Sequence, residues 1–190
     1  MTVSRRWMLL PLCLLALSGT PRVGAAQEAA RLADLTVTNT RDDLLLYTRV
    51  QGAFREEMTR AILSGVPATF SFLTSLHEVR DMWFDREIAD VTATHTLSYD
   101  TLKKEFTVKR SWEAGPPHVT RSFEEARQWM SSVEGLRVAG LDRLEKGRQY
   151  QLRAKAELSK TTLPLYLHYV LFFVSLWDFE TDWMTVDFIY

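Results

Sequence analysis

The chain has 190 residues, of which 46% are hydrophobic, 25% charged and 12% aromatic. These values are ordinary for a folded globular protein and exclude a disordered, collagen-like or low-complexity chain. The formal net charge of −1 argues against a nucleic-acid-binding protein, because that function needs a concentrated positive face.

The first 26 residues have the organisation of a secretory signal peptide. Two arginines at positions 5 and 6 precede an apolar run, Trp7–Leu17, and small residues follow at positions 23–26. Cleavage there leaves residues 27–190 as a single domain. An uncleaved signal anchor is the alternative, although the apolar run is shorter than the roughly 20 residues of a membrane-spanning helix.

The mature domain is free of cysteine, because the single cysteine, Cys13, lies within the signal peptide. Cleavage removes three of the 23 basic residues and none of the 24 acidic residues, so the net charge falls to −4. The only asparagine, Asn39, lies outside a glycosylation sequon. A domain with these properties is typical of the bacterial periplasm and has to be stable through its core alone.

Alternating apolar and polar residues predict strands along most of the mature domain. The first two cover residues 35–38 and 44–50, with a turn between them. A short helix follows over residues 54–62 and ends at Gly65 and Pro67. A third strand begins near Ala68.

The clearest hairpin is predicted over residues 91–112, with its turn at Asp100 and Thr101 and Leu102 on the apolar face of the second strand. Ser122 and Glu125 have the spacing of a capping box. They begin a helix over residues 123–133 that Gly135 closes. Two more strands are predicted over residues 150–158 and 184–190.

These patterns predict a mainly β fold with seven or eight strands and two short helices. Strands and helices do not alternate, which argues against a parallel α/β sheet. One polar face on each strand is typical of antiparallel sheets with one solvated side. We therefore expect a β-rich α+β domain, an antiparallel two-sheet sandwich with small helices at its ends, of which the immunoglobulin fold is one arrangement.

The sequence resembles a known family over about residues 35–190. The resemblance is carried by five segments: Arg41–Leu44, Ala61–Pro67, Trp83–Asp85, Gly147–Tyr150 and Leu163–Trp183. The family is the uncharacterised bacterial domain of unknown function 4390. The resemblance implies a small exported proteobacterial protein without an assigned activity, often encoded near a membrane sensor kinase. It implies no catalytic residues.

Aromatic and acidic residues gather in two places along the chain. In the first, Trp83 and Phe84 lie among the carboxylates of Asp81, Asp85 and Glu87. In the second, Asp178, Glu180 and Asp182 lie between Trp177 and Trp183. We expect five aromatic side chains from the two clusters to contact a partner: Trp83, Phe84, Trp177, Phe179 and Trp183.

The carboxylates of the two clusters suggest two alternatives with a different chemistry. Asp178, Glu180 and Asp182 would share one face of a strand, where they could coordinate a hard cation, whereas in a turn the same spacing makes a solvated acidic corner. Any of the three, or Asp85, could divide acid and base work in a hydrolase. Aromatic rings among acids also suit a carbohydrate-binding module.

Other catalytic patterns are absent from the sequence. The four histidines form no metal-type pair, and no nucleophile elbow or phosphate-binding loop occurs. His95 lies on the apolar face of its strand, so we expect a neutral, hydrogen-bonded core residue. We expect no cofactor.

Residues 163–177 carry no charge and include several aromatic side chains. Their aromatic residues suit a membrane interface, but a charge-free run of this length is more often a buried core segment. The alternating C-terminal residues also fit a small outer-membrane β-barrel, although the predicted strands carry many charges.

The sequence therefore favours a non-enzymatic periplasmic protein that binds an envelope protein or the membrane surface. An accessory role in envelope signalling, with a membrane sensor kinase as the partner, is one form of this hypothesis.

Overall fold

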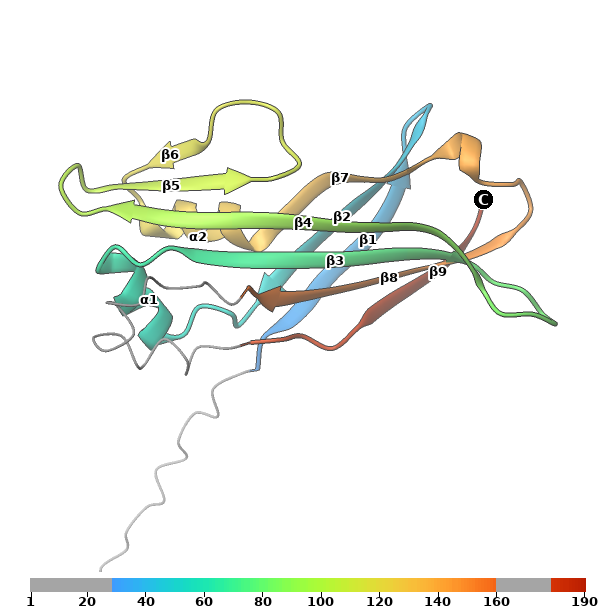
Figure 1. Cartoon of the computed structure of the whole chain (residues 1–190), viewed down its shortest axis with the longest axis horizontal. Helices are drawn as coiled ribbons and strands as arrows, with labels where there is room; N and C mark the ends of the chain where they lie inside the picture. The colour runs from blue at the N-terminus through green and yellow to red at the C-terminus, as the bar shows by residue number, and fades with distance from the viewer. Residues whose placement is uncertain (1–28, 160–178) are drawn as a thin grey trace, which may run out of the picture.

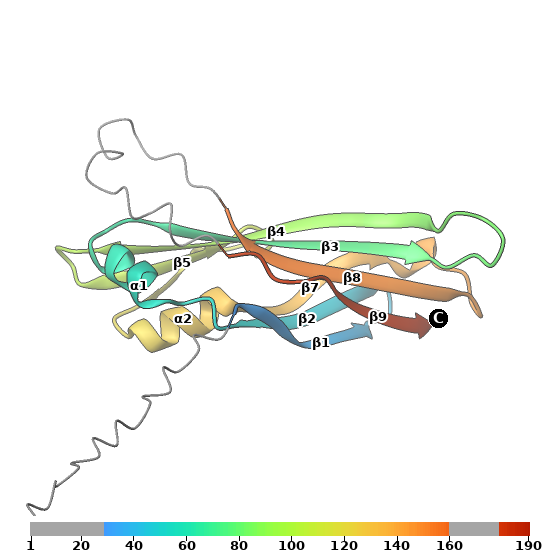
Figure 2. The same ribbon diagram turned by 90° about the horizontal axis from the view of Figure 1, so that it is seen from below.

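The structure, a computed structural model, describes residues 29–159 and 179–190. Within these residues, two antiparallel sheets pack face to face, accompanied by two α-helices (Figures 1 and 2). This arrangement confirms the predicted two-sheet sandwich. The predicted signal peptide and the charge-free run 163–177 lie outside the described residues.

The smaller sheet has three strands in the order β1-β2-β7, and the larger sheet has six in the order β6-β5-β4-β3-β8-β9. The strands of the smaller sheet are β1 (Arg31–Asn39), β2 (Asp43–Gln51) and β7 (Ser132–Gly140). Those of the larger sheet are β3 (Ala68–Glu78), β4 (Arg86–Asp100), β5 (Glu105–Arg110), β6 (His118–Thr120), β8 (Gln149–Leu158) and β9 (Met184–Ile189).

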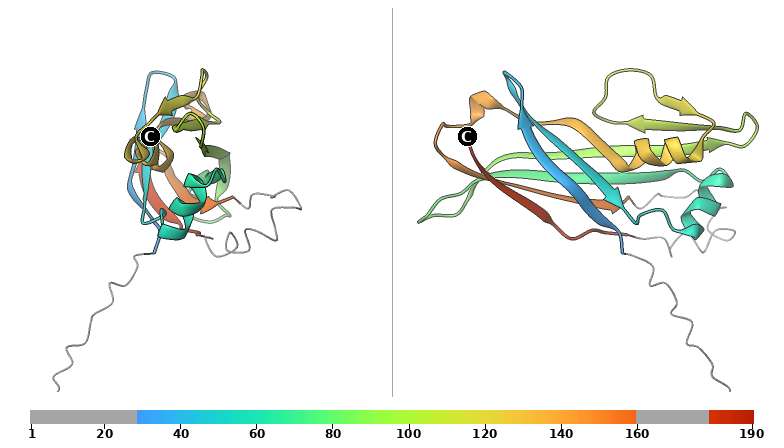
Figure 3. Two further views of the ribbon diagram at one scale, coloured as in Figure 1. Left: turned by 90° about the vertical axis from the view of Figure 1, so that its left-hand side faces the viewer. Right: turned by 180° about the vertical axis from the view of Figure 1, so that it is seen from behind.

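Both helices, α1 (Glu56–Leu63) and α2 (Phe123–Ser131), lie at one end of the sandwich (Figure 1). Helix α1 contacts β4, and α2 packs against β4, β5 and β6. The connection between β3 and β4 projects at the opposite end (Figure 3). A short 3-10 helix, η1 (Leu141–Arg143), lies in the connection from β7 to β8.

The strand order of the two sheets is that of an immunoglobulin-like sandwich. In variable-type immunoglobulin domains, strands A, B and E share one sheet, and strands G, F, C, C′ and C″ form the other. The orders β1-β2-β7 and β9-β8-β3-β4-β5 match these two sets. The difference lies at the place of strand D, because β6 pairs with β5 instead of β7.

A second immunoglobulin-like feature is a buried tyrosine near the start of β8. Tyr150 is inaccessible to solvent, and its hydroxyl accepts a hydrogen bond from the backbone N–H of Glu145 at 2.8 Å. A tyrosine bonded to backbone a few residues upstream is characteristic of this corner of the sandwich. Leu152, two residues further on, stands where antibody domains have a disulfide cysteine, and it too is fully buried. Apolar packing therefore replaces the disulfide.

The core lies between the inner faces of the sheets, where alternate residues of each strand meet. On β3, for example, Phe70, Phe72, Thr74 and Leu76 share the inner face and are buried, while Leu73 and Ser75 between them are partly exposed. The predicted strands at residues 35–38, 44–50, 68 onward, 91–99, 150–158 and 184–190 are all confirmed.

The predictions were wrong in detail around the second helix. Helix α2 ends at Ser131, and β7 begins at the next residue, so Gly135 lies inside a strand with a φ of 81°. The Ser122 hydroxyl does accept the backbone N–H of Glu125, at 3.3 Å. In a complete capping box the Glu125 side chain would accept the Ser122 backbone N–H. Here that N–H donates to the hydroxyl of Thr120 instead.

The predicted hairpin over residues 91–112 is confirmed, but its turn is longer than expected. Residues 101–104 form the turn, and the carboxylate of Asp100 accepts the backbone N–H groups of Leu102 and Lys103 at 2.9 and 3.0 Å. Leu102 is therefore a solvent-exposed turn residue and does not belong to the apolar face of β5.

Candidate functional site

The most unusual surface feature is the connection between β3 and β4, residues 79–85, which we call the tip (Figure 1). Its three apolar side chains, Met82, Trp83 and Phe84, have exposed fractions of 89%, 80% and 95%. We call these residues the apolar triplet. Contiguous exposed apolar residues of this kind mark interaction sites in soluble proteins.

Local sequence explains why the triplet lies outside the core. Successive residues of a strand face opposite sides of a sheet, so three consecutive apolar residues cannot all point inward. The ladder between β3 and β4 ends at the pair Glu78 and Arg86. Beyond this pair the chain leaves both strands, and the triplet is carried at the turn.

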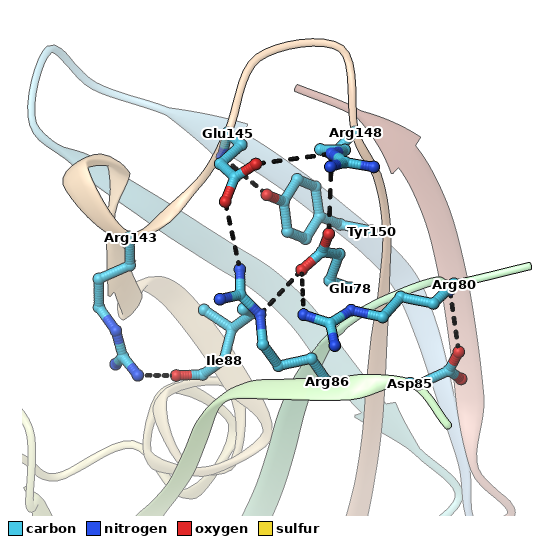
Figure 4. Close-up of polar contacts among 9 residues, drawn as sticks. All are labelled: Glu78, Arg80, Asp85, Arg86, Ile88, Arg143, Glu145, Arg148 and Tyr150. Atoms are coloured by element: carbon cyan, nitrogen blue, oxygen red, sulfur yellow. Dashed lines mark hydrogen bonds and ion pairs between the residues drawn. The ribbon is translucent and has the colours of Figure 1, made fainter. Parts of the chain in front are cut away.

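A cluster of ionic side chains lies at the base of the tip (Figure 4). At its centre, the Glu78 side chain faces inward at the end of β3 and is only 4% exposed. Its Oε2 accepts hydrogen bonds from Arg86 Nε at 2.8 Å and from Arg80 Nη2 at 3.3 Å. Its Oε1 lies 3.8 Å from Arg148 Nε. Three cations thus surround one buried carboxylate.

The connection between β7 and β8 supplies a second carboxylate, Glu145. Its oxygens lie 3.8 Å from Arg86 Nη2 and 3.5 Å from Arg148 Nε. Beside the same cluster, Arg143 donates to the backbone carbonyl of Ile88 on β4. The β7–β8 connection, which follows β7 of the smaller sheet, is therefore tied to the strand that supports the tip (Figure 4).

Asp85 connects the two ends of the tip. Its Oδ1 accepts the backbone N–H of Arg80 at 3.4 Å, and its Oδ2 lies 3.9 Å from Arg153 Nη2 on β8. Asp81 and Asp85 thus place one carboxylate on each side of the apolar triplet.

The second predicted aromatic cluster is divided in the structure. Phe179 is buried, with its ring centroid 4.8 Å from that of Phe70 in an edge-to-face arrangement. The prediction that Phe179 contacts a partner therefore does not hold, because its side chain is a core residue. Trp183 is half exposed, and Lys155 Nζ lies 5.2 Å from its ring centroid. Trp177 lies outside the described residues.

Two of the three candidate metal ligands can be placed. Glu180 Oε1 lies 2.6 Å from Lys155 Nζ, so a lysine already takes the position of a counter-cation. The hydrogen bond between them raises the pKa of Lys155 and lowers that of Glu180. The backbone carbonyl of Asp182 accepts from Thr181, and Asp178 lies outside the described residues. The described residues contain no cluster of three or more potential metal ligands.

The two clusters lie far apart along the larger sheet. Trp183 adjoins Lys155, which pairs with Leu73 on β3, five residues before the end of that strand. At about 3.3 Å per residue, this separation is roughly 17 Å before the tip begins. Trp83 and Trp183 therefore belong to different surfaces. Asp85 and Glu180 have different cationic partners, because Asp85 lies beside Arg153 and Glu180 beside Lys155.

His95 is the buried core histidine that the sequence predicted. Its side chain is inaccessible, its Nδ1 lies 3.0 Å from the carbonyl oxygen of Met130, and its Nε2 accepts the Trp112 indole N–H at 3.1 Å. Burial lowers the pKa of His95 to about 4. The ring is therefore neutral at pH 7, with both nitrogens satisfied.

The ionic cluster at the base of the tip was missed by the sequence analysis. Its members come from β3, the tip, β4 and the β7–β8 connection, and no spacing rule joins residues 78 and 148. Met82 was missed as well, although its position beside Trp83 and Phe84 was a signal that the sequence contained.

The fold and the site define a disulfide-free, immunoglobulin-like β-sandwich that carries an apolar tip at one end. The chain belongs to a family described as a domain of unknown function, DUF4390, whose sequence profile matches residues 27–187. The resemblance seen in the sequence is thereby confirmed. No curated protein and no solved structure matches the chain. In the part of the chain that the structure describes, no helix is long and apolar enough to cross a membrane.

Proposed function

We propose that this chain is a non-enzymatic binding protein of the bacterial cell envelope that docks on a partner protein through the tip. One observation carries the proposal: Met82, Trp83 and Phe84 stand almost fully in solvent on a protruding turn. Tryptophan and other large aromatic residues are typical anchors of protein interfaces, where they fill desolvated pockets of the partner.

The charges beside the triplet favour a protein over a lipid bilayer. Asp81 and Asp85 flank the apolar residues directly, and an anionic bilayer surface would repel them. The arginines behind them are engaged with Glu78 and Glu145. The complementary surface is therefore an apolar pocket bordered by lysine or arginine residues, which a protein can supply.

The pairing of the carboxylates with cations supports a non-enzymatic function. Asp85 lies 3.9 Å from Arg153 Nη2, and Glu180 is neutralised by Lys155. His95, a common type of acid–base catalyst, is buried with both ring nitrogens bonded. These residues have structural partners that account for them.

The predicted signal peptide directs the proposal to the envelope, with the periplasm as the compartment. The family resemblance adds a membrane sensor kinase as the first partner to test, in an accessory role in signalling. Both are proposals that rest on the sequence.

Site-specific photo-crosslinking in the native cells tests this function. A photoreactive amino acid at Trp83 should crosslink to a discrete protein, identified by mass spectrometry, whereas one at Leu102 should not. Leu102 is a matched control because it is 93% exposed and lies on the β4–β5 turn at the opposite end of the sandwich.

A triple alanine variant of Met82, Trp83 and Phe84 should lose the crosslinked partner while keeping the native circular dichroism spectrum. A Leu102→Ala, Val119→Ala variant, which removes two exposed apolar residues elsewhere, should keep the partner. The proposal is wrong if position 83 gives no protein crosslink. It is also wrong if the triplet is needed instead for flotation of the purified domain with phosphatidylethanolamine–phosphatidylglycerol vesicles.

A further inference from the structure

We infer that Glu78 is the positioning residue of the tip: its buried carboxylate holds both legs of the turn and presents the apolar triplet in a fixed arrangement. This inference rests on the proposed docking function, because it explains how the docking residues are ordered before a partner binds. Glu78 itself does not reach the exposed surface.

The tip has few contacts of its own. Apart from Glu78, the described contacts are two hydrogen bonds from backbone N–H groups, Val79 to the carbonyl of Gln149 at 2.9 Å and Arg80 to Asp85 Oδ1 at 3.4 Å, and an ion pair of 3.9 Å between Asp85 and Arg153. The triplet side chains stand in solvent and add almost no packing. A turn held this weakly would sample many conformations unless side chains at its base restrain it.

Glu78 supplies that restraint because it binds an arginine on each leg. Arg80 lies on the chain leaving β3, and Arg86 lies on the chain entering β4. Both donate to the same oxygen, Oε2, at 3.3 and 2.8 Å. Because the carboxylate is buried and binds both arginines, it restrains the distance between the two legs of the tip (Figure 4).

The other oxygen of Glu78 connects the tip to the rest of the domain. Oε1 faces Arg148, which also pairs with Glu145 of the β7–β8 connection. The backbone of Glu145 is fixed in turn by the Tyr150 hydroxyl. Through Arg148 and Glu145, the tip is thus connected to the buried side chain of Tyr150.

The position of Glu78 argues for a role beyond stability. Glu78 occupies the next inward-facing place on β3 after Leu76, where a fully buried apolar residue would otherwise continue the core. Burial of a carboxylate is unfavourable unless cations and hydrogen bonds compensate it. A carboxylate at this position accepts hydrogen bonds from the arginines of both legs, which an apolar side chain cannot do.

Spin labelling tests the inference without any partner. The mature domain has no cysteine, so Met82→Cys or Leu102→Cys can each carry a single nitroxide. Glu78→Gln should raise the mobility of a label at position 82 and leave a label at position 102 unchanged. Glu113→Gln is the matched control, because Glu113 is a partly buried glutamate that binds Arg110 and His118 near α2, away from the tip.

Loss of the Glu78 charge leaves no buried unpaired cation, since Arg80, Arg86 and Arg148 are each between 40% and 60% exposed and can turn to solvent. Should Glu78→Gln fail to fold, Arg86→Gln releases one leg and keeps Glu78 paired with Arg80 and Arg148. The inference is overturned if mobility at position 82 does not change, or if positions 82 and 102 loosen equally.

Affinity for the partner crosslinked at Trp83 provides the second measurement. Glu78→Gln should weaken binding roughly tenfold, because the partner must then order the tip itself. A partner that binds Glu78→Gln as tightly as the native domain overturns the inference and leaves the docking function standing. If Glu78→Gln raises the mobility of the tip but position 83 crosslinks to no protein, the docking function is wrong and the ordering of the tip by Glu78 stands.

Discussion

The buried imidazole of His95 should make the domain lose stability in mildly acidic solution. In the neutral ring, the Nδ1–H donates to the carbonyl of Met130 and Nε2 accepts the indole N–H of Trp112. Protonation would place a second N–H at Nε2, facing the donor of Trp112. Desolvation by burial, with the charge of Arg110 as a smaller contribution, lowers the pKa of His95 from 6.5 to about 4.

The sign and size of the effect follow from this difference in pKa. Below pH 6.5 the unfolded chain binds a proton at His95, and the native state does not until the pH approaches 4. The unfolded state therefore gains protons first, and the free energy of unfolding falls as the pH falls. Between pH 7.5 and pH 5, the loss from this single residue amounts to about 2 kcal/mol.

Urea unfolding at a series of pH values measures this loss, with His95→Gln as the control. The glutamine variant cannot titrate, so the stability difference between the native domain and the variant should shrink by about 2 kcal/mol on going to pH 5. Glu113, whose pKa is lowered by its hydrogen bonds to Arg110 and His118, loses its contribution only below about pH 4.5 and is common to both proteins. A pH-independent difference, or an NMR titration of His95 with a pKa above 6, would refute the reasoning.

Two further predictions concern stability. Tyr150→Phe removes the hydroxyl that accepts the Glu145 N–H and should lower the free energy of unfolding by about 1 kcal/mol, as measured in urea. Tyr99 packs its ring on Phe106, and Tyr99→Phe should lower that free energy by less than half as much. Equal losses in the two variants would contradict the role of the Tyr150 hydroxyl. Ser122→Ala removes the cap of α2 and should also cost about 1 kcal/mol, a result that an unchanged urea midpoint would exclude.

The sequence predicts most strands because alternation is a local property. Wherever one face of a strand meets the core, apolar residues recur at every second position, as at Phe70 and Phe72 on β3. Strand β7 was not predicted from the sequence. Val138 and Ala139 are both buried although they are neighbours, and bulges shift the register of β7 against β2. A bulge breaks the period on which the prediction depends.

In the candidate site, too, local sequence predicted some features and tertiary packing decided others. Trp83 and Phe84 were predicted as contact residues, and both are exposed, whereas Phe179, predicted on the same grounds, is buried. An aromatic residue next to acids has the same local pattern in either place. Whether it is buried depends on what packs over it, and for Phe179 that is Phe70, more than one hundred residues away in the chain.

The sequence alone determined the β-rich class, the family, the export signal as a prediction, and the neutral state expected for His95. All of these rest on residue type and on spacing within a few residues. Tertiary structure decided the immunoglobulin-like strand order and the convergence of Arg80, Arg86 and Arg148 on Glu78. The pairing of β3 with β8, in which Glu78 lies opposite Tyr150, brings Arg148 close to Glu78. The hydrogen-bonded register fixes which side chains meet, and it leaves no mark on local spacing.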